Sequence, residues 1–185
     1  WQLNATIMFN GAMAGALGLS GLLAFYTALA TGRMGIVSPI SSTGVIIPFA
    51  IGILSGDKPS GLQLVGVVVA IAGVILASGP ELSGGAPARP VALAAYSAFA
   101  FGLCVYFMSK GGQLNPGMTV VAMRFTQVAI MMTVAIVVRS RGGLTRDDVP
   151  MLVLIGATDA IANIFYTMAA GSGMLSVVSV LGSLF

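Results

Sequence analysis

The feature that most constrains this chain is a series of long uncharged apolar runs, separated by short clusters of glycine, proline and charged residues. A transmembrane helix needs about 20 mostly apolar residues to cross a hydrocarbon core about 30 Å thick. The runs therefore predict an all-α membrane protein, a polytopic helical bundle. Six spans and the start of a seventh are expected at residues 5–30, 35–54, 61–78, 91–108, 117–138, 150–170 and from 174 onward.

Composition excludes most other classes of protein. Hydrophobic residues make up 57% of the chain, charged residues only 7%, and the mean hydropathy is +1.03. The basic residues lie mainly between apolar runs, as in membrane topology signals, so no nucleic-acid partner is expected. With no histidine and one cysteine, Cys104, the chain has no means of building a zinc site, a disulfide or a Ser-His pair. We expect no cofactor, no metal and no enzymatic activity.

An internal repeat relates two distant segments, residues 25–37 and 165–177, which share six identities in thirteen positions. The copies lie five spans apart, and because five is odd, the second enters the membrane from the opposite side. This is the pattern of an inverted-topology repeat, which predicts alternating access. The identical pairs are Phe25 and Phe165, Tyr26 and Tyr166, Thr27 and Thr167, Ala30 and Ala170, Met34 and Met174, and Val37 and Val177.

The repeat also predicts the domain organisation. Residues 1–82 are expected to be the later helices of a first repeat, residues 83–89 a linker, and residues 90–185 the first helices of a second. When each repeat is completed from the other, using the spacing between residues 25–37 and 165–177, the intact protein is expected to have ten helices. The chain starts at Trp1 without an initiator methionine, so we expect a fragment that lacks both ends.

Several short motifs occur in an order shared with a known family. The chain resembles EamA-type members of the drug/metabolite transporter (DMT) superfamily. One departure is Asp57, because the family more often has Gly-Glu where this chain has Gly56-Asp57. The resemblance implies a ten-helix secondary carrier with two inverted five-helix repeats in a bacterial cytoplasmic membrane. The motifs are Tyr26-Thr-Ala-Leu-Ala, Ser38-Pro39, Pro48, Ser55-Gly56-Asp57-Lys58-Pro59 before Gly66, Tyr96, Lys110, Pro116 and Arg124-Phe125.

Two charged residues fall within predicted spans. Asp159 lies nine residues after Pro150 and Arg124 eight after Pro116, so both reach a depth of roughly 12–13 Å from opposite membrane faces. An ion pair between them would relieve the cost of burying each charge in lipid. A purely structural pair is an equal alternative, and a snorkelling Arg124 is a further one. The functional hypothesis is that Asp159 carries a proton during transport.

Further candidates for a solute site surround this pair. Asp159, Asn163, Tyr166 and Ala170 fall on one helical face, which should point into the bundle. Tyr26, the repeat counterpart of Tyr166, is a second aromatic candidate, and core packing is the alternative for each tyrosine. Hydroxyls and prolines interrupt the second span, so we expect Ser38 and Ser42 at the cavity wall and Pro39 and Pro48 at gates or hinges.

Two other patterns predict packing and orientation. Gly66, Ala70, Gly73 and Ala77 share one face of the third span, which should pack closely against another helix. Loops containing Arg33, Arg89, Arg139, Arg141 and Arg146 alternate with loops containing Lys58 and Lys110. The arginine-bearing side is therefore predicted to be cytoplasmic.

The leading functional hypothesis is a secondary transporter of a small metabolite, amino acid or drug-like solute. It is expected to work without ATP, because no phosphate-binding Gly-x-x-x-x-Gly-Lys-Ser/Thr loop is present. The expected partners are that solute, the lipid bilayer and a coupled proton, with a homodimer left open. Alternatives from other classes are an intramembrane enzyme, which would need a second membrane carboxylate, and a channel or scaffold protein.

Overall fold

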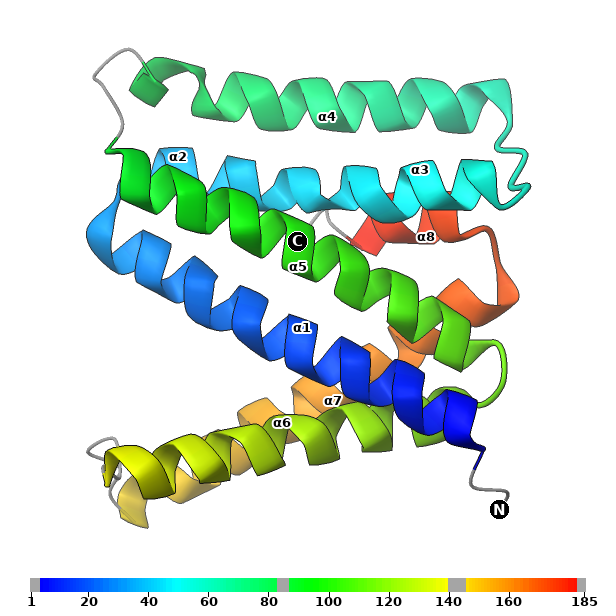
Figure 1. The fold of residues 1–185 in the computed structure, drawn as a ribbon. Helices are drawn as coiled ribbons and strands as arrows, with labels where there is room; N and C mark the ends of the chain where they lie inside the picture. Colours follow the sequence, from blue (N-terminus) through cyan, green and yellow to red (C-terminus); the bar gives the residue numbers. More distant parts are fainter. Residues whose placement is uncertain (1–3, 83–86, 140–145, 183–185) are drawn as a thin grey trace.

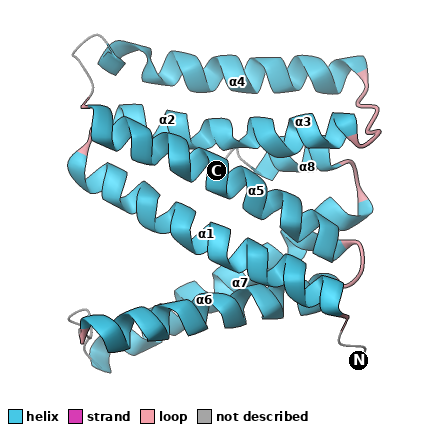
Figure 2. Cartoon of the chain, viewed as in Figure 1, coloured by secondary structure: helices cyan, strands magenta, loops and turns pink. Residues whose placement is uncertain are grey.

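The computed structural model describes residues 4–82, 87–139 and 146–182, and this part of the chain is helical with no strand (Figure 2). The predicted all-α class is confirmed there. In chain order the elements are α1 (Ala5–Thr31), α2 (Met34–Ser42), the 3-10 turn η1 (Thr43–Val45), α3 (Ile46–Leu54), α4 (Gly61–Leu82), α5 (Ala88–Gly112), α6 (Pro116–Val138), η2 (Arg146–Asp148), α7 (Val149–Ser172) and α8 (Leu175–Gly182) (Figure 1).

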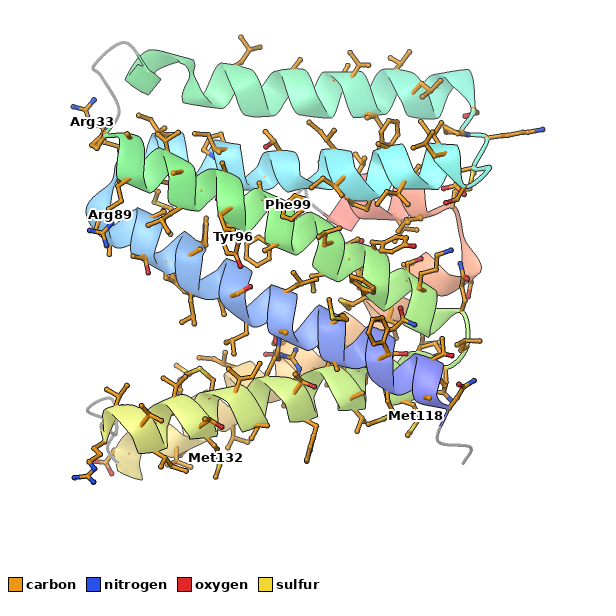
Figure 3. The ribbon with its side chains drawn as sticks, in the orientation of Figure 1. Arg33, Arg89, Tyr96, Phe99, Met118 and Met132 are labelled. Carbon is orange, nitrogen blue, oxygen red and sulfur yellow. The ribbon has the colours of Figure 1, made fainter. Side chains whose placement is uncertain are left out.

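In residues 4–82, 87–139 and 146–182, five segments are long and apolar enough to cross a membrane, which indicates an integral membrane protein. These are Ala5–Thr31, Met34–Leu54, Ala88–Gly112, Pro116–Val138 and Val149–Ser172, each within a few residues of a predicted span. The 22-residue α4 coincides with another predicted span, and the eight-residue α8 with the start of the last. Large apolar side chains such as Phe99 and Met132 project outward from the bundle (Figure 3) and are more than half exposed, as suits contact with lipid.

Helix boundaries follow local chemistry. The side chain of Asn115 accepts a hydrogen bond from the Met118 amide at 3.0 Å, and Pro116 occupies the first turn of α6, where no amide donor is needed. Asn4 caps α1 in the same way through the Thr6 amide. Asp148 occupies the N-cap position of α7.

The second predicted span is interrupted at its middle. Pro39 lies inside α2 and Pro48 inside α3, and each lacks the amide that would continue the helical hydrogen bonds. Hydroxyls compete for carbonyls in the same region, since Thr43 donates to the Ile40 carbonyl at 2.6 Å. The η1 turn between the two helices confirms that prolines and hydroxyls disturb this span.

Helix α5 lies at the centre of the bundle, against α1, α2, α3, α6 and α7. Small residues allow its close approach to its neighbours: a Cβ at Gly102 would lie 2.6 Å from the Gly44 carbonyl oxygen. In the same way a Cβ at Gly11 or Gly15 of α1 would lie 2.5 Å from atoms of α6. Glycine spaced by four residues is therefore the basis of the α1–α6 contact.

The close packing predicted for the small face of α4 is not found at Gly66 and Gly73, the two members of that face whose surroundings the structure describes. A Cβ built at Gly66 or Gly73 meets nothing within 4 Å, and both glycines are exposed. Helix α4 lies at the edge of the bundle (Figure 1), where it contacts α2 and α8. Its residue Val67 is buried. The predicted linker, residues 83–89, is shorter than expected at its end, because α5 begins at Ala88; residues 83–86 lie outside the described part.

Candidate functional site

A cavity of about 540 Å³ lies between the helices and has walls from α1, α2, η1, α3, α5, α6, α7 and α8. This volume is within the range of pockets that hold small organic molecules. The cavity brings together eight of the nine residues predicted for the site; Pro39 is the one that does not line it. The eight are Tyr26, Ser38, Ser42, Pro48, Arg124, Asp159, Asn163 and Tyr166.

The most polar part of the wall is a cluster of four side chains on α6 and α7. Arg124 Nη2 forms an ion pair with Asp159 Oδ2, and its Nη1 donates to Gln127 Oε1 at 2.9 Å. Asn163 Nδ2 donates to Asp159 Oδ1 at 3.1 Å and to the Asp159 carbonyl oxygen at 2.8 Å. The carboxylate therefore accepts hydrogen bonds on both oxygens. We name Arg124, Gln127, Asp159 and Asn163 the polar cluster.

The ion pair satisfies two charges that would be costly inside a membrane. An unpaired Arg or Asp at the centre of a span costs about 2.5–3.5 kcal/mol on insertion scales. The Arg124 guanidinium is held by Asp159 and Gln127, which favours the ion pair over a snorkelling arginine. Side-chain exposures of 31% for Arg124 and 54% for Asp159 show that the pair is not sealed within the protein. Both residues border the cavity and remain open to an incoming molecule.

The polar face of α7 becomes more buried along the helix. Asp159 is exposed, Asn163 and Tyr166 are half-buried, and Ala170 is buried. The Tyr166 hydroxyl has no hydrogen-bond partner within the described chain. Its ring lies against Gly182 of α8, where a Cβ would be 2.5 Å from Tyr166 Cε2. Tyr26 also borders the cavity but is 61% exposed, so the two repeat-related tyrosines have different environments.

Serines form the opposite wall, on α2 and α8. Ser41 and Ser97 hydroxyls lie 2.7 Å apart in a buried hydrogen bond between α2 and α5. Ser42 donates to the Ser38 carbonyl at 3.0 Å, and Ser179 to the Ser176 carbonyl at 3.1 Å. The hydroxyl protons of Ser42 and Ser179 are therefore used within their own helices.

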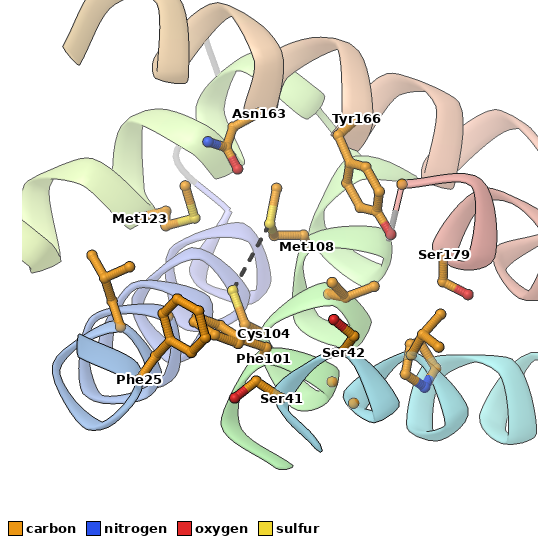
Figure 4. A pocket seen from close by; sticks show the side chains of 18 of the residues that line it. Phe25, Ser41, Ser42, Phe101, Cys104, Met108, Met123, Asn163, Tyr166 and Ser179 are labelled. Atoms are coloured by element: carbon orange, nitrogen blue, oxygen red, sulfur yellow. Dashed lines mark hydrogen bonds between the residues drawn. The ribbon is translucent and has the colours of Figure 1, made fainter. Parts of the chain in front are cut away.

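Sequence reasoning missed much of the apolar wall (Figure 4). Cys104 Sγ lies 4.0 Å from Met108 Sδ, one turn apart on α5. Apolar and sulfur-containing side chains in a membrane helix give no signal that separates a cavity wall from a helix contact. Gln127 did carry a signal, because it is an amide within a span, three residues after Arg124. The missed wall residues include Phe25, Phe101, Cys104, Met108, Met123 and Gln127.

The groups that line the cavity determine what it can bind. No group of three or more His, Cys, Asp or Glu side chains suitable for a metal ion occurs in residues 4–82, 87–139 and 146–182. Asp159 is the one carboxylate among the residues that line the cavity. A cavity with a mostly apolar wall and one charged cluster can hold a small amphipathic solute.

Comparisons with known proteins return no match: no protein-family model, no curated protein and no solved structure matches this chain. The resemblance to EamA-type transporters therefore rests on the sequence motifs alone and stays a prediction.

Proposed function

We propose that this chain is part of a secondary transporter that carries a small metabolite, amino acid or drug-like solute across a bacterial cytoplasmic membrane. The observation that carries the proposal is the cavity, which both predicted repeats line and which has its charged cluster near the middle of α6 and α7. Solute sites of carriers with inverted repeats lie near the membrane midplane, between the repeats.

The course of the chain supports an inverted repeat. Helices α1 and α7, which contain the two sequence copies, run in opposite directions across the bundle (Figure 1). Each ends at an extended glycine: Gly32 has φ −123° and ψ −173°, and Gly173 has φ −116° and ψ −171°. A new helix begins two residues after each of these glycines, at Met34 and Leu175. The two turns therefore share a backbone geometry as well as a sequence pattern.

The polar cluster gives this carrier a route for coupling to protons. A proton on Asp159 would remove its negative charge and release Arg124 from the ion pair. Arg124 would then be available to a solute with an acidic or carbonyl group. Asn163 holds the second carboxylate oxygen and would keep Asp159 oriented through this exchange.

The test is counterflow of labelled solute in proteoliposomes of the full-length protein that contains this chain, with candidate solutes first chosen by its thermal stabilisation. A carrier shows saturable counterflow, whereas electrical conductance would favour a channel. Absence of both would leave an enzyme or scaffold and overturn the proposal. For coupling, Asp159→Asn should abolish uptake driven by a pH gradient but retain solute exchange. Full gradient-driven uptake by Asp159→Asn would overturn the proton hypothesis.

A further inference from the structure

The α3–α4 turn lies against the start of α8, which packs beside α3. Asp57 Oδ2 accepts hydrogen bonds from the Ser176 amide at 3.0 Å and from the Ser176 hydroxyl at 2.9 Å. The two residues are 119 positions apart and belong to the two predicted repeats. Ser176 is fully buried. Asp57 therefore acts as an N-terminal cap supplied from outside the helix, with its negative charge at the positive end of α8.

The backbone around Asp57 is built to hold this carboxylate in place. The Gly56 amide donates to the Ile53 carbonyl at 3.1 Å, and the Asp57 amide to the Gly52 carbonyl at 3.0 Å. This pair of hydrogen bonds is the Schellman motif that ends many helices. Gly56 has φ +104°, a conformation that side-chain-bearing residues rarely adopt. The end of α3 thus fixes the direction of the chain at Asp57.

Close packing surrounds the same contact. A Cβ at Gly52 would lie 2.7 Å from Asp57 Oδ2 and 2.9 Å from the Ser176 amide nitrogen. Nearby, a Cβ at Gly112 of α5 would lie 2.6 Å from the Thr167 carbonyl oxygen of α7. The bundle is therefore tightly closed at the end that carries Lys58 and Lys110. One turn further into α8, Ser179 already borders the cavity.

At the other end, α6 and α7 make little contact with the rest of the described chain. Every described residue from 131 to 139 and from 147 to 159 is exposed. The buried residues of α6 are confined to Thr119, Val120, Ala122 and Met123, in its first half. The structure therefore combines a closed end at the lysine-bearing loops with separated helices at the arginine-bearing loops.

We propose that Asp57 is a gating residue: its hydrogen bonds to Ser176 hold α3 against α8 and close the cavity at the lysine-bearing end. Opening that end requires the two hydrogen bonds to break and α8 to move away from Gly52. The role of this gate in a transport cycle rests on the proposed function, but the closure itself does not. Asp57→Ala should therefore favour the state that is open at the lysine-bearing end.

The chain supplies its own reporter for the experiment. Cys104 is the single cysteine and borders the cavity, with 9% exposure. Its alkylation rate by a membrane-impermeant maleimide, added to the full chain in proteoliposomes from one side at a time, measures opening at that side. Asp57→Ala should raise the rate from the lysine-bearing side by about tenfold or more, the factor expected for losing hydrogen bonds to a charged group. Ser176→Ala keeps the amide contact and should give a smaller increase.

Asp147→Asn is the matched control, because it removes an exposed loop carboxylate next to α7, away from the gate. It should leave the rate unchanged from both sides. An unchanged rate in Asp57→Ala would overturn the gate, and so would equal increases from both sides, which indicate general loosening. Because alkylation needs no solute flux, a failure of the proposed transport function would leave this result interpretable on its own.

Discussion

At the scale of single residues, the charged pair within the membrane explains most about the site. Arg124 and Asp159 were expected at matching depth from helix rise alone, and the structure pairs them. What the sequence did not provide is the extension of the pair by Gln127 and Asn163, because side-chain rotamers decide which amide reaches which charge. The four side chains form one network, so their contributions to stability should not be additive.

A double-mutant cycle tests that network. Arg124→Gln and Asp159→Asn each leave one charge without its partner and should lower the free energy of unfolding. The double variant removes both charges and should be more stable than the sum of the single effects predicts, with a coupling free energy of about 1–2 kcal/mol. Unfolding of the detergent-solubilised protein measures all four states. Additive losses would mean that the two charges do not interact.

Two tyrosines allow a second residue-scale prediction. The buried Tyr166 hydroxyl has no partner in the described chain, whereas Tyr96 donates to the Ser20 hydroxyl at 3.1 Å. Tyr166→Phe removes an unsatisfied polar group. It should leave the free energy of unfolding unchanged or raise it by up to about 1 kcal/mol. Tyr96→Phe loses a hydrogen bond and should lower the free energy of unfolding by about 0.5–1 kcal/mol. The reverse order of stabilities would show that Tyr166 is hydrogen-bonded in the membrane.

At the scale of helices, the sequence was most informative about where spans lie and least about which faces meet. Hydropathy located α1, α5, α6 and α7 to within a few residues. Small-residue spacing, in contrast, occurs on both α1 and α4, and only the α1 stripe has a partner in the described chain. Spacing shows that a face can accept a close neighbour, but the tertiary arrangement decides whether one is present.

Glycine substitutions distinguish these two stripes. Gly15→Ala would place a Cβ 2.5 Å from the Met123 carbonyl oxygen, and because backbone cannot yield easily, α1 and α6 must separate. We expect a loss of about 1–3 kcal/mol in unfolding free energy. Gly66→Ala, with open space around it, should be neutral or slightly stabilising because alanine favours helix. A comparable loss in Gly66→Ala would reveal a partner for α4 in the membrane.

At the scale of the whole molecule, the candidate site was predictable to the extent that its residues are polar. Asp159, Asn163, Tyr166 and Arg124 stand out in apolar helices, and all four border the cavity. The wall from α5, including Phe101 and other apolar residues, was not predictable, because membrane helices are apolar on every face. Pro39 shows the opposite error, since a conspicuous residue of the interrupted span lies away from the cavity wall.

The arrangement of the loops leads to a prediction of membrane orientation. Arg33 and Arg89 lie at the same end of the bundle (Figure 3). The α3–α4 connection, which carries Lys58, and the end of α5, which carries Lys110 in its last turn, lie at the other end (Figure 1). Positively charged residues are retained on the cytoplasmic side, so the arginine-bearing end should face the cytoplasm. The gate at Asp57 would then close the outer end, and the separated halves of α6 and α7 would lie at the inner end.

Site-directed labelling tests this orientation. In a Cys104→Ala background, Gln113→Cys places an exposed thiol at the lysine-bearing end, and Thr31→Cys places one at the arginine-bearing end. A membrane-impermeant maleimide added to intact cells should label Gln113→Cys but not Thr31→Cys, and permeabilising the cells should make both reactive. The opposite pattern would invert the orientation and place the Asp57 gate on the cytoplasmic side. Equal labelling in intact cells would contradict the arrangement of the two ends on opposite membrane faces.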